Sequence, residues 1–217
     1  MNLKAVLARI AAARAAAIAP AKETRLIAVS KGHGAERILP TLEAGHRAFG
    51  ENKVQEAKAK WPDLRARFAD IELHLIGPLQ TNKVREALAL FDVIHVLDRL
   101  KLAEALKAEM EKTAKRPRLF VEVNTGEEIQ KVGIAPKETV AFVRQCRDDL
   151  GLPVEGLMCI PPAGEEPALH FALLQSLARE CGLASLSMGM SDDFETAIRF
   201  GATDVRVGTA IFGERGK

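Results

Sequence analysis

Apolar and polar positions follow two recurring patterns that alternate along the chain. Short apolar runs, typical of buried strands, are separated by longer segments whose apolar residues recur at helical spacing. Leu100, Ala103 and Leu106 show that helical spacing clearly. We expect strands over eight segments: Leu26–Val29, Arg47–Phe49, Ile71–Ile76, Val93–Val96, Leu119–Asn124, Val154–Met158, Ser185–Met188 and Asp204–Val207.

Eight strands that alternate with helices predict an α/β fold. Connections of this length through a helix favour parallel neighbouring strands, and eight such repeats are typical of a TIM (β/α)8 barrel. An open doubly wound sheet is the alternative. No linker divides the chain, so we expect one domain over residues 1–217. Leu3, Val6 and Ile10 predict an extra amphipathic helix within residues 1–20, packed on the barrel, with a transit peptide as the alternative.

Composition narrows the classes of protein. The 217 residues are 47% hydrophobic and 28% charged, which argues against disorder and against a membrane protein. The 31 basic and 29 acidic residues nearly balance, so no nucleic-acid surface is expected. Cys146, Cys159 and Cys181 form no metal-ligand pattern. Scattered cysteines of this kind fit a cytoplasmic protein without a metal site.

Chemistry in such a barrel belongs at the carboxyl ends of the strands. The first strand ends in Ser30-Lys31, followed by Gly32-His33-Gly34. A lysine at an apolar strand end loses hydration, which favours the neutral amine and makes it a nucleophile toward carbonyl groups. The alternative is that Lys31 extends into solvent along its own aliphatic stem.

The last strand carries an arginine whose parity differs from that of its apolar neighbours. If Val205 and Val207 face the outer helices, Arg206 points into the barrel. There it could bind a ligand or form a salt bridge with Glu122. Gly208 and Thr209 follow and could form an anion-binding turn.

Three further polar residues each have two interpretations. Ser191 is expected to cap a helix, and the free N–H groups of that helix end could also hold a phosphate beside the serine hydroxyl. His74 shares a strand face with Glu72 and is either a core histidine or a ligand contact at the barrel mouth. Asn52 either caps a helix or places an amide near Lys31.

A lysine able to form an imine, together with a separate anion site, matches the needs of pyridoxal 5′-phosphate (PLP). The segments AVSK, FGENKVQEA, HLIGPLQTNK, GLMCIPP, SMGMSDDFETAI and VRVGTAIFG carry a closer resemblance. In this order they resemble the pyridoxal phosphate homeostasis protein family. The resemblance implies the barrel of the amino-terminal domain of alanine racemase. It also implies a carrier or regulator of this form of vitamin B6, without robust catalytic activity.

The resemblance also implies roles for individual residues. Lys31 would hold PLP through a covalent imine, a Schiff base, and Arg206 would face the pyridine nitrogen. Asn52 and His74 would lie near the ring. The phosphate would be held by Ser191, Gly208 and Thr209. Apo forms of PLP-dependent enzymes are the candidate recipients, and a monomer is expected.

Two features favour a carrier over an enzyme. Alanine racemase uses a tyrosine from a second domain as one of two acid–base groups, whereas this sequence contains no tyrosine and we expect no second domain. An arginine opposite the ring nitrogen also supplies no proton readily, which weakens the cofactor as an electron sink. The alternatives are a PLP-dependent enzyme acting on amino acids, such as a weak racemase, and a Schiff-base aldolase for a sugar phosphate.

Overall fold

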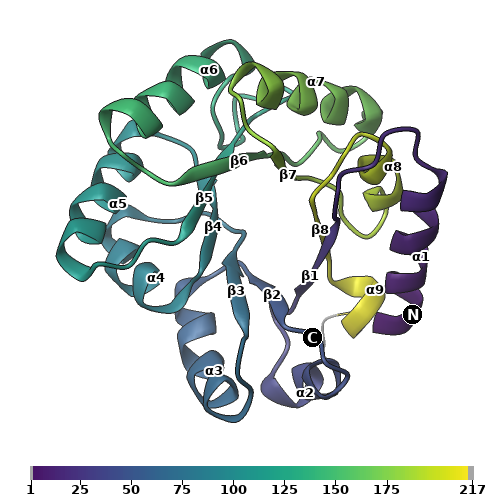
Figure 1. Cartoon of the computed structure of the whole chain (residues 1–217). Coiled ribbons are helices and arrows are strands. Elements are labelled where there is room, and N and C mark those ends of the chain that lie inside the picture. The colour runs from purple at the N-terminus through teal and green to yellow at the C-terminus, as the bar shows by residue number, and fades with distance from the viewer. Residues whose placement is uncertain (1, 215–217) are drawn as a thin grey trace.

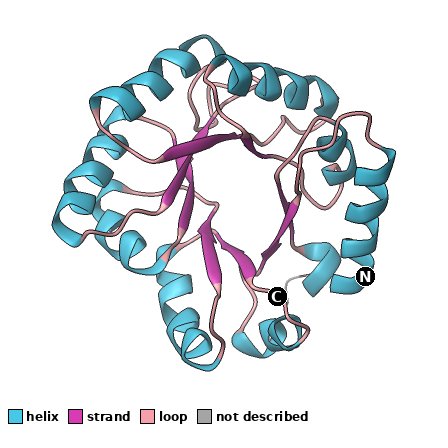
Figure 2. Cartoon of the chain, in the orientation of Figure 1, coloured by secondary structure: helices cyan, strands magenta, loops and turns pink. Residues whose placement is uncertain are grey.

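Eight parallel strands close into a barrel in the computed structural model, which describes residues 2–214 (Figures 1 and 2). The barrel closes where Ala28 of the first strand pairs with Val207 of the last. This closure confirms the predicted TIM barrel over the open sheet. The strands are β1 (Arg25–Val29), β2 (Ala48–Glu51), β3 (Glu72–Leu75), β4 (Val93–Leu97), β5 (Arg118–Glu122), β6 (Val154–Met158), β7 (Ser185–Ser187) and β8 (Asp204–Val207).

Helices form a ring outside the strands and bury one face against them (Figure 1). They are α1 (Leu3–Ala16), α2 (Ala35–Glu43), α3 (Val54–Arg67), α4 (Val84–Leu90), α5 (Leu100–Thr113), α6 (Pro136–Arg144), α7 (Pro167–Glu180), α8 (Phe194–Arg199) and α9 (Thr209–Phe212). A 3₁₀ turn, η1 (Thr81–Lys83), precedes α4, and a π-helical segment, η2 (Gln145–Asp149), follows α6. In the described part of the chain, no helix is both long and apolar enough to cross a bilayer.

Strand residues alternate between the helices and the barrel interior. Leu73 and Leu75 of β3 and Val205 of β8 are completely buried in the apolar core. The residues between them, His74 and Arg206, bond to side chains of other strands inside the barrel. The face toward the helices is therefore apolar, whereas buried polar side chains on the interior face bond to one another.

The predicted amino-terminal helix is present as α1, beside α8 and α9 in Figure 1. Val6, Ile10 and Ala13 lie on its buried face. The Arg9 guanidinium also pairs with the Glu195 carboxylate on α8, with 2.9 Å between nitrogen and oxygen. Apolar contact therefore holds α1 to the barrel, and one half-exposed ion pair adds little to it.

Candidate functional site

Lys31 lies in a tight turn directly after β1 and is half-buried. Gly32, the next residue, has a φ of 75°, a left-handed conformation that glycine adopts without strain. Its amide donates a hydrogen bond of 2.6 Å to Glu56 Oε1. The sequence therefore ends β1 with a turn whose geometry places the lysine at the carboxyl end of the barrel.

Lys60 of α3 holds this turn in place through hydrogen bonds to its backbone. Its ammonium donates to the carbonyl oxygens of Ser30 and His33, both at 3.0 Å. The same nitrogen lies 2.8 Å from the Glu51 carboxylate, which is completely buried at the end of β2. Burial raises the pKa of Glu51, although the Lys60 charge opposes that shift. We call the contacts of Lys60 and Glu51 to this turn the β1-turn clamp.

Arg206 is almost completely buried inside the barrel, as the strand parity predicts. One terminal nitrogen donates to Ser187 Oγ at 2.7 Å, and the other donates to the carbonyl oxygen of Cys159 at 2.9 Å. The salt bridge with Glu122, one of the two alternatives, is not among the ion pairs of the described residues. A serine at the end of β7 and a carbonyl after β6 hold the guanidinium instead.

Glu122 ends β5 and faces the same end of the barrel. Its side chain is buried, and Oε2 has no hydrogen-bond partner among residues 2–214. Burial and the nearby Asp98 carboxylate raise the pKa of Glu122 to about 7, against the opposing charge of Arg206. The carboxyl group therefore changes charge near neutral pH. The sequence analysis does not predict Glu122 as a site residue and names it only as a possible partner of Arg206.

Gly208 brings the end of β8 against the end of β1. A Cβ atom at this position would stand 3.0 Å from the carbonyl oxygen of Val29 and 3.3 Å from its Cβ. Thr209 follows as the exposed first residue of α9, where helix geometry leaves backbone N–H groups without intrahelical partners. Because Val29 is two residues before Lys31, the lysine turn and the predicted anion-binding turn are neighbours.

Ser191 does not cap a helix, so that prediction is wrong. Helix α8 begins at Phe194 with Asp193 as its N-cap, and Ser191 lies half-buried in the preceding turn. Asp193 Oδ1 accepts a hydrogen bond of 2.6 Å from the amide of Met190, which closes this turn before the helix begins. Ser191 still lies between β7 and α8, at the same end of the barrel as Gly208.

His74 takes the core interpretation of the two. It is completely buried, and both ring nitrogens bond to protein groups: Nδ1 to His95 Nε2 at 2.9 Å and Nε2 to Glu72 Oε1 at 2.7 Å. Asn52 is half-buried after β2 and lines a cavity of about 370 Å³ with Gln80 of the following loop. Asn52 therefore lies at the correct end of the barrel, whereas His74 has no nitrogen left for a ligand.

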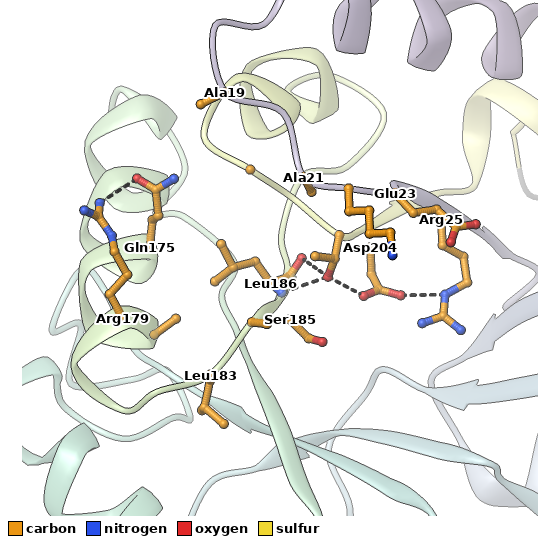
Figure 3. Close-up of a pocket in the computed structure, with 15 residues that line it drawn as sticks. Ala19, Ala21, Glu23, Arg25, Gln175, Arg179, Leu183, Ser185, Leu186 and Asp204 are labelled. Atoms are coloured by element: carbon orange, nitrogen blue, oxygen red, sulfur yellow. Dashed lines mark hydrogen bonds and ion pairs between the residues drawn. The ribbon is translucent and has the colours of Figure 1, made fainter.

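A larger cavity, of about 660 Å³, lies at the opposite end, where the strands begin (Figure 3). Arg25 and Asp204, the first residues of β1 and β8, line it and pair with each other at 2.9 Å. The described residues contain no group of three or more His, Cys, Asp or Glu side chains suited to a metal ion. The chemistry of Lys31, Arg206 and Gly208, and not cavity volume, makes the carboxyl end of the barrel the candidate site.

Comparison with known proteins identifies the family. Residues 1–216 match the family model of the alanine racemase N-terminal domain. The pyridoxal phosphate homeostasis protein of Pseudomonas aeruginosa is 41% identical over 99% of this chain and 94% of its own length.

Solved structures agree in fold. PipY of Synechococcus elongatus, solved with PLP bound, is 37% identical, with a TM-score of 0.81 over 95% of this chain and 99% of its own. Alanine racemase of Bartonella henselae, at 18% identity, has a TM-score of 0.71 over all of this chain and 61% of its own, which supports the fold alone. The chain therefore belongs to the pyridoxal phosphate homeostasis protein family, with the barrel of the alanine racemase N-terminal domain.

Proposed function

We propose that this protein binds PLP covalently through Lys31 and carries or buffers the cofactor inside the cell. The observation that carries the proposal is the contact of Gly208 with Val29, which makes the lysine turn and the turn after β8 neighbours. A small ring with an aldehyde on one side and a phosphate on the other suits such a pair of turns. PLP bound to PipY, a relative of similar length, supports the choice of ligand.

The roles of the other residues follow from their chemistry. Arg206 is a buried cation with hydrogen-bond donors only, so it would face an unprotonated pyridine nitrogen. Backbone amides after Gly208, with the Thr209 and Ser191 hydroxyls, would hold the phosphate. Asn52 would lie beside the ring. His74 would act behind it, through other side chains, because both of its nitrogens are engaged.

We further propose that the protein is not a dedicated enzyme and works as a single barrel. Its curated relatives are named for homeostasis of the cofactor. Racemisation requires acid–base groups on both faces of the substrate, and the sequence has no tyrosine to serve as one of them. PLP held through an imine can pass to another amine by exchange, so apo forms of PLP-dependent enzymes are the recipients that fit this chemistry.

The test begins with PLP added to the purified protein. We expect visible absorbance typical of an imine, trapped on Lys31 by borohydride and located by mass spectrometry. Lys31→Ala should abolish this absorbance, whereas Lys101→Ala, which removes an exposed lysine on α5, should leave it unchanged. Failure to bind PLP, or trapping of PLP on another lysine alone, would refute the proposal.

A second experiment separates a carrier from an enzyme. The protein loaded with PLP is incubated with L-amino acids in deuterated water, and exchange of the α-proton is followed by NMR. We expect no exchange above that given by free PLP. Exchange at the rate of a dedicated racemase would show that the enzyme alternative is correct.

A further inference from the structure

Five polar side chains join the two ends of the barrel through its interior. The series starts at Arg206 and passes through Ser187 of β7, His95 of β4 and His74 of β3 to Glu72 at the start of β3. The hydrogen bonds are 2.7 Å (Arg206 to Ser187), 2.9 Å (Ser187 to His95), 2.9 Å (His95 to His74) and 2.7 Å (His74 to Glu72). We call this series the axial chain. Ser187, His95 and His74 are completely buried, so water does not compete for these bonds.

The two ends of the axial chain fix the direction of every bond in it. Arg206 can only donate, so Ser187 Oγ accepts from it and has its own proton left to give. At the other end, burial would raise the pKa of Glu72, but the hydrogen bond from His74 and the ion pairs with Arg25 and Arg118 lower it. An ionised carboxylate can only accept, so His74 must donate through Nε2.

The middle of the chain then has one consistent assignment. The Ser187 hydroxyl donates to His95 Nδ1, and His95 Nε2–H donates to His74 Nδ1. If the hydrogen bonds ran in the opposite direction and His74 were neutral, the lone pair of His74 Nε2 would face the Glu72 carboxylate at 2.7 Å. Reversal with a protonated His74 would place a cation in a site where burial already lowers its pKa. Both imidazoles are therefore neutral and protonated on Nε2.

The surroundings of His95 support this assignment. Burial lowers the pKa of His95 well below its ordinary value, and the charges of Arg206, Arg25 and Arg118 act in the same direction. Phe120 of β5 stacks on the His95 ring, with 4.5 Å between ring centroids and 7° between planes. The stacking holds the imidazole in the plane that both of its hydrogen bonds require.

We propose that Ser187, His95 and His74 are positioning residues that hold Arg206 toward the cofactor through a one-way chain of hydrogen bonds ending on Glu72. Every proton in the chain points away from the binding site, so the chain fixes the direction of the Arg206 guanidinium and supplies no proton to the pyridine nitrogen. The inference about the cofactor rests on the proposed function. The direction of the chain is a property of the protein without PLP.

The first test uses the protein without PLP. NMR spectra that correlate each imidazole nitrogen with the ring protons distinguish the two neutral tautomers and the cation. We expect His74 and His95 to be neutral and protonated on Nε2 at neutral pH, with signals assigned from the variants below. His95 protonated on Nδ1, or either ring charged, would overturn the assignment, whatever the result for PLP binding.

The second test exchanges His95 for residues that keep or break the chain. His95→Gln offers one acceptor and one donor and can preserve the direction, whereas His95→Leu cannot. His95→Leu removes the hydrogen bonds to Ser187 and His74, so Ser187 no longer holds Arg206 in a fixed direction, and PLP binding should weaken about tenfold. Most of the affinity should be kept in His95→Gln. His46→Gln, a change outside the axial chain, should bind as the unchanged protein does.

A structural role alone predicts a different result. If His95 serves only packing, His95→Leu will bind PLP normally and the absorbance of the bound cofactor will keep its dependence on pH; that outcome overturns the proposal. Should His95→Leu fail to fold, Ser187→Ala breaks the same chain with a smaller change of volume. Lys31 remains in all these variants. If the unchanged protein itself shows no imine absorbance, the proposed function fails, and that result says nothing against the axial chain.

Discussion

Glu122→Gln should remove a destabilising charge from the carboxyl end of the barrel. Glu122 is buried, one of its oxygens has no hydrogen-bond partner in residues 2–214, and Asp98 lies close enough to disfavour its ionisation. Glutamine has nearly the same shape and stays neutral at every pH. The change therefore isolates the cost of ionising this carboxyl group in the folded protein.

The pKa of Glu122 sets the size and the sign of the effect. In the folded protein the pKa is about 7, against an ordinary value of 4.5. Between these values the folded state holds a proton that the unfolded state releases, so the free energy of unfolding falls as the pH rises from 4.5 to 7. At about 1.4 kcal/mol per pKa unit, the loss reaches roughly 3 kcal/mol by pH 8.

Urea unfolding of both proteins without PLP, at a series of pH values, measures this effect. We expect the difference in free energy of unfolding between Glu122→Gln and the unchanged protein to shift by about 3 kcal/mol in favour of the variant between pH 4.5 and pH 8. Glu104→Gln, which removes an exposed carboxylate from α5, is the control and should show little change. A difference that stays constant with pH would refute the buried, protonated state of Glu122.

Three other changes test separate parts of the molecule. Glu72→Gln should cost roughly 1–2 kcal/mol of stability above pH 4.5, because Arg25 and Arg118 lower the pKa of this half-exposed carboxylate in the folded protein; that stability is lost as the pH falls through the lowered pKa, so the unfolding curves should converge in acid. Glu51→Gln removes the buried carboxylate beside the Lys60 ammonium, which keeps its ion pair with Glu56 at 3.0 Å, and should cost about 2 kcal/mol, measured by urea unfolding, while unaltered stability would contradict the β1-turn clamp. Gly208→Ala places a Cβ 3.0 Å from the Val29 carbonyl and should weaken PLP binding, measured by titration, more than it lowers the melting temperature; equal binding would separate this turn from the site.

The fold was predictable because its signals are local. Alternating apolar runs and amphipathic segments identify eight strands, and β6 and β8 have the predicted bounds, Val154–Met158 and Asp204–Val207. Strand parity also predicts that His74 and Arg206 lie on the interior face. Each of these inferences needs only a few neighbouring residues.

The partners of interior residues were not predictable in the same way. His95 and Ser187 belong to strands that are not neighbours in the barrel, and they meet only because of its closure and stagger. Ser191 shows a different limit. A serine before two aspartates is a good capping signal, yet Asp193, two residues later, closes the turn and starts the helix.

Under the proposed function, the β1-turn clamp affects how PLP would leave Lys31. The Lys60 ammonium donates hydrogen bonds to two carbonyl groups around Lys31, and the Glu51 carboxylate pairs with the same ammonium. These hydrogen bonds hold the turn in place and oppose its movement away from the site. Release of bound PLP would therefore depend on a second amine that reaches the exposed edge of the site and displaces Lys31 from the imine. The lifetime of the loaded protein should decrease as the concentration of competing amines rises.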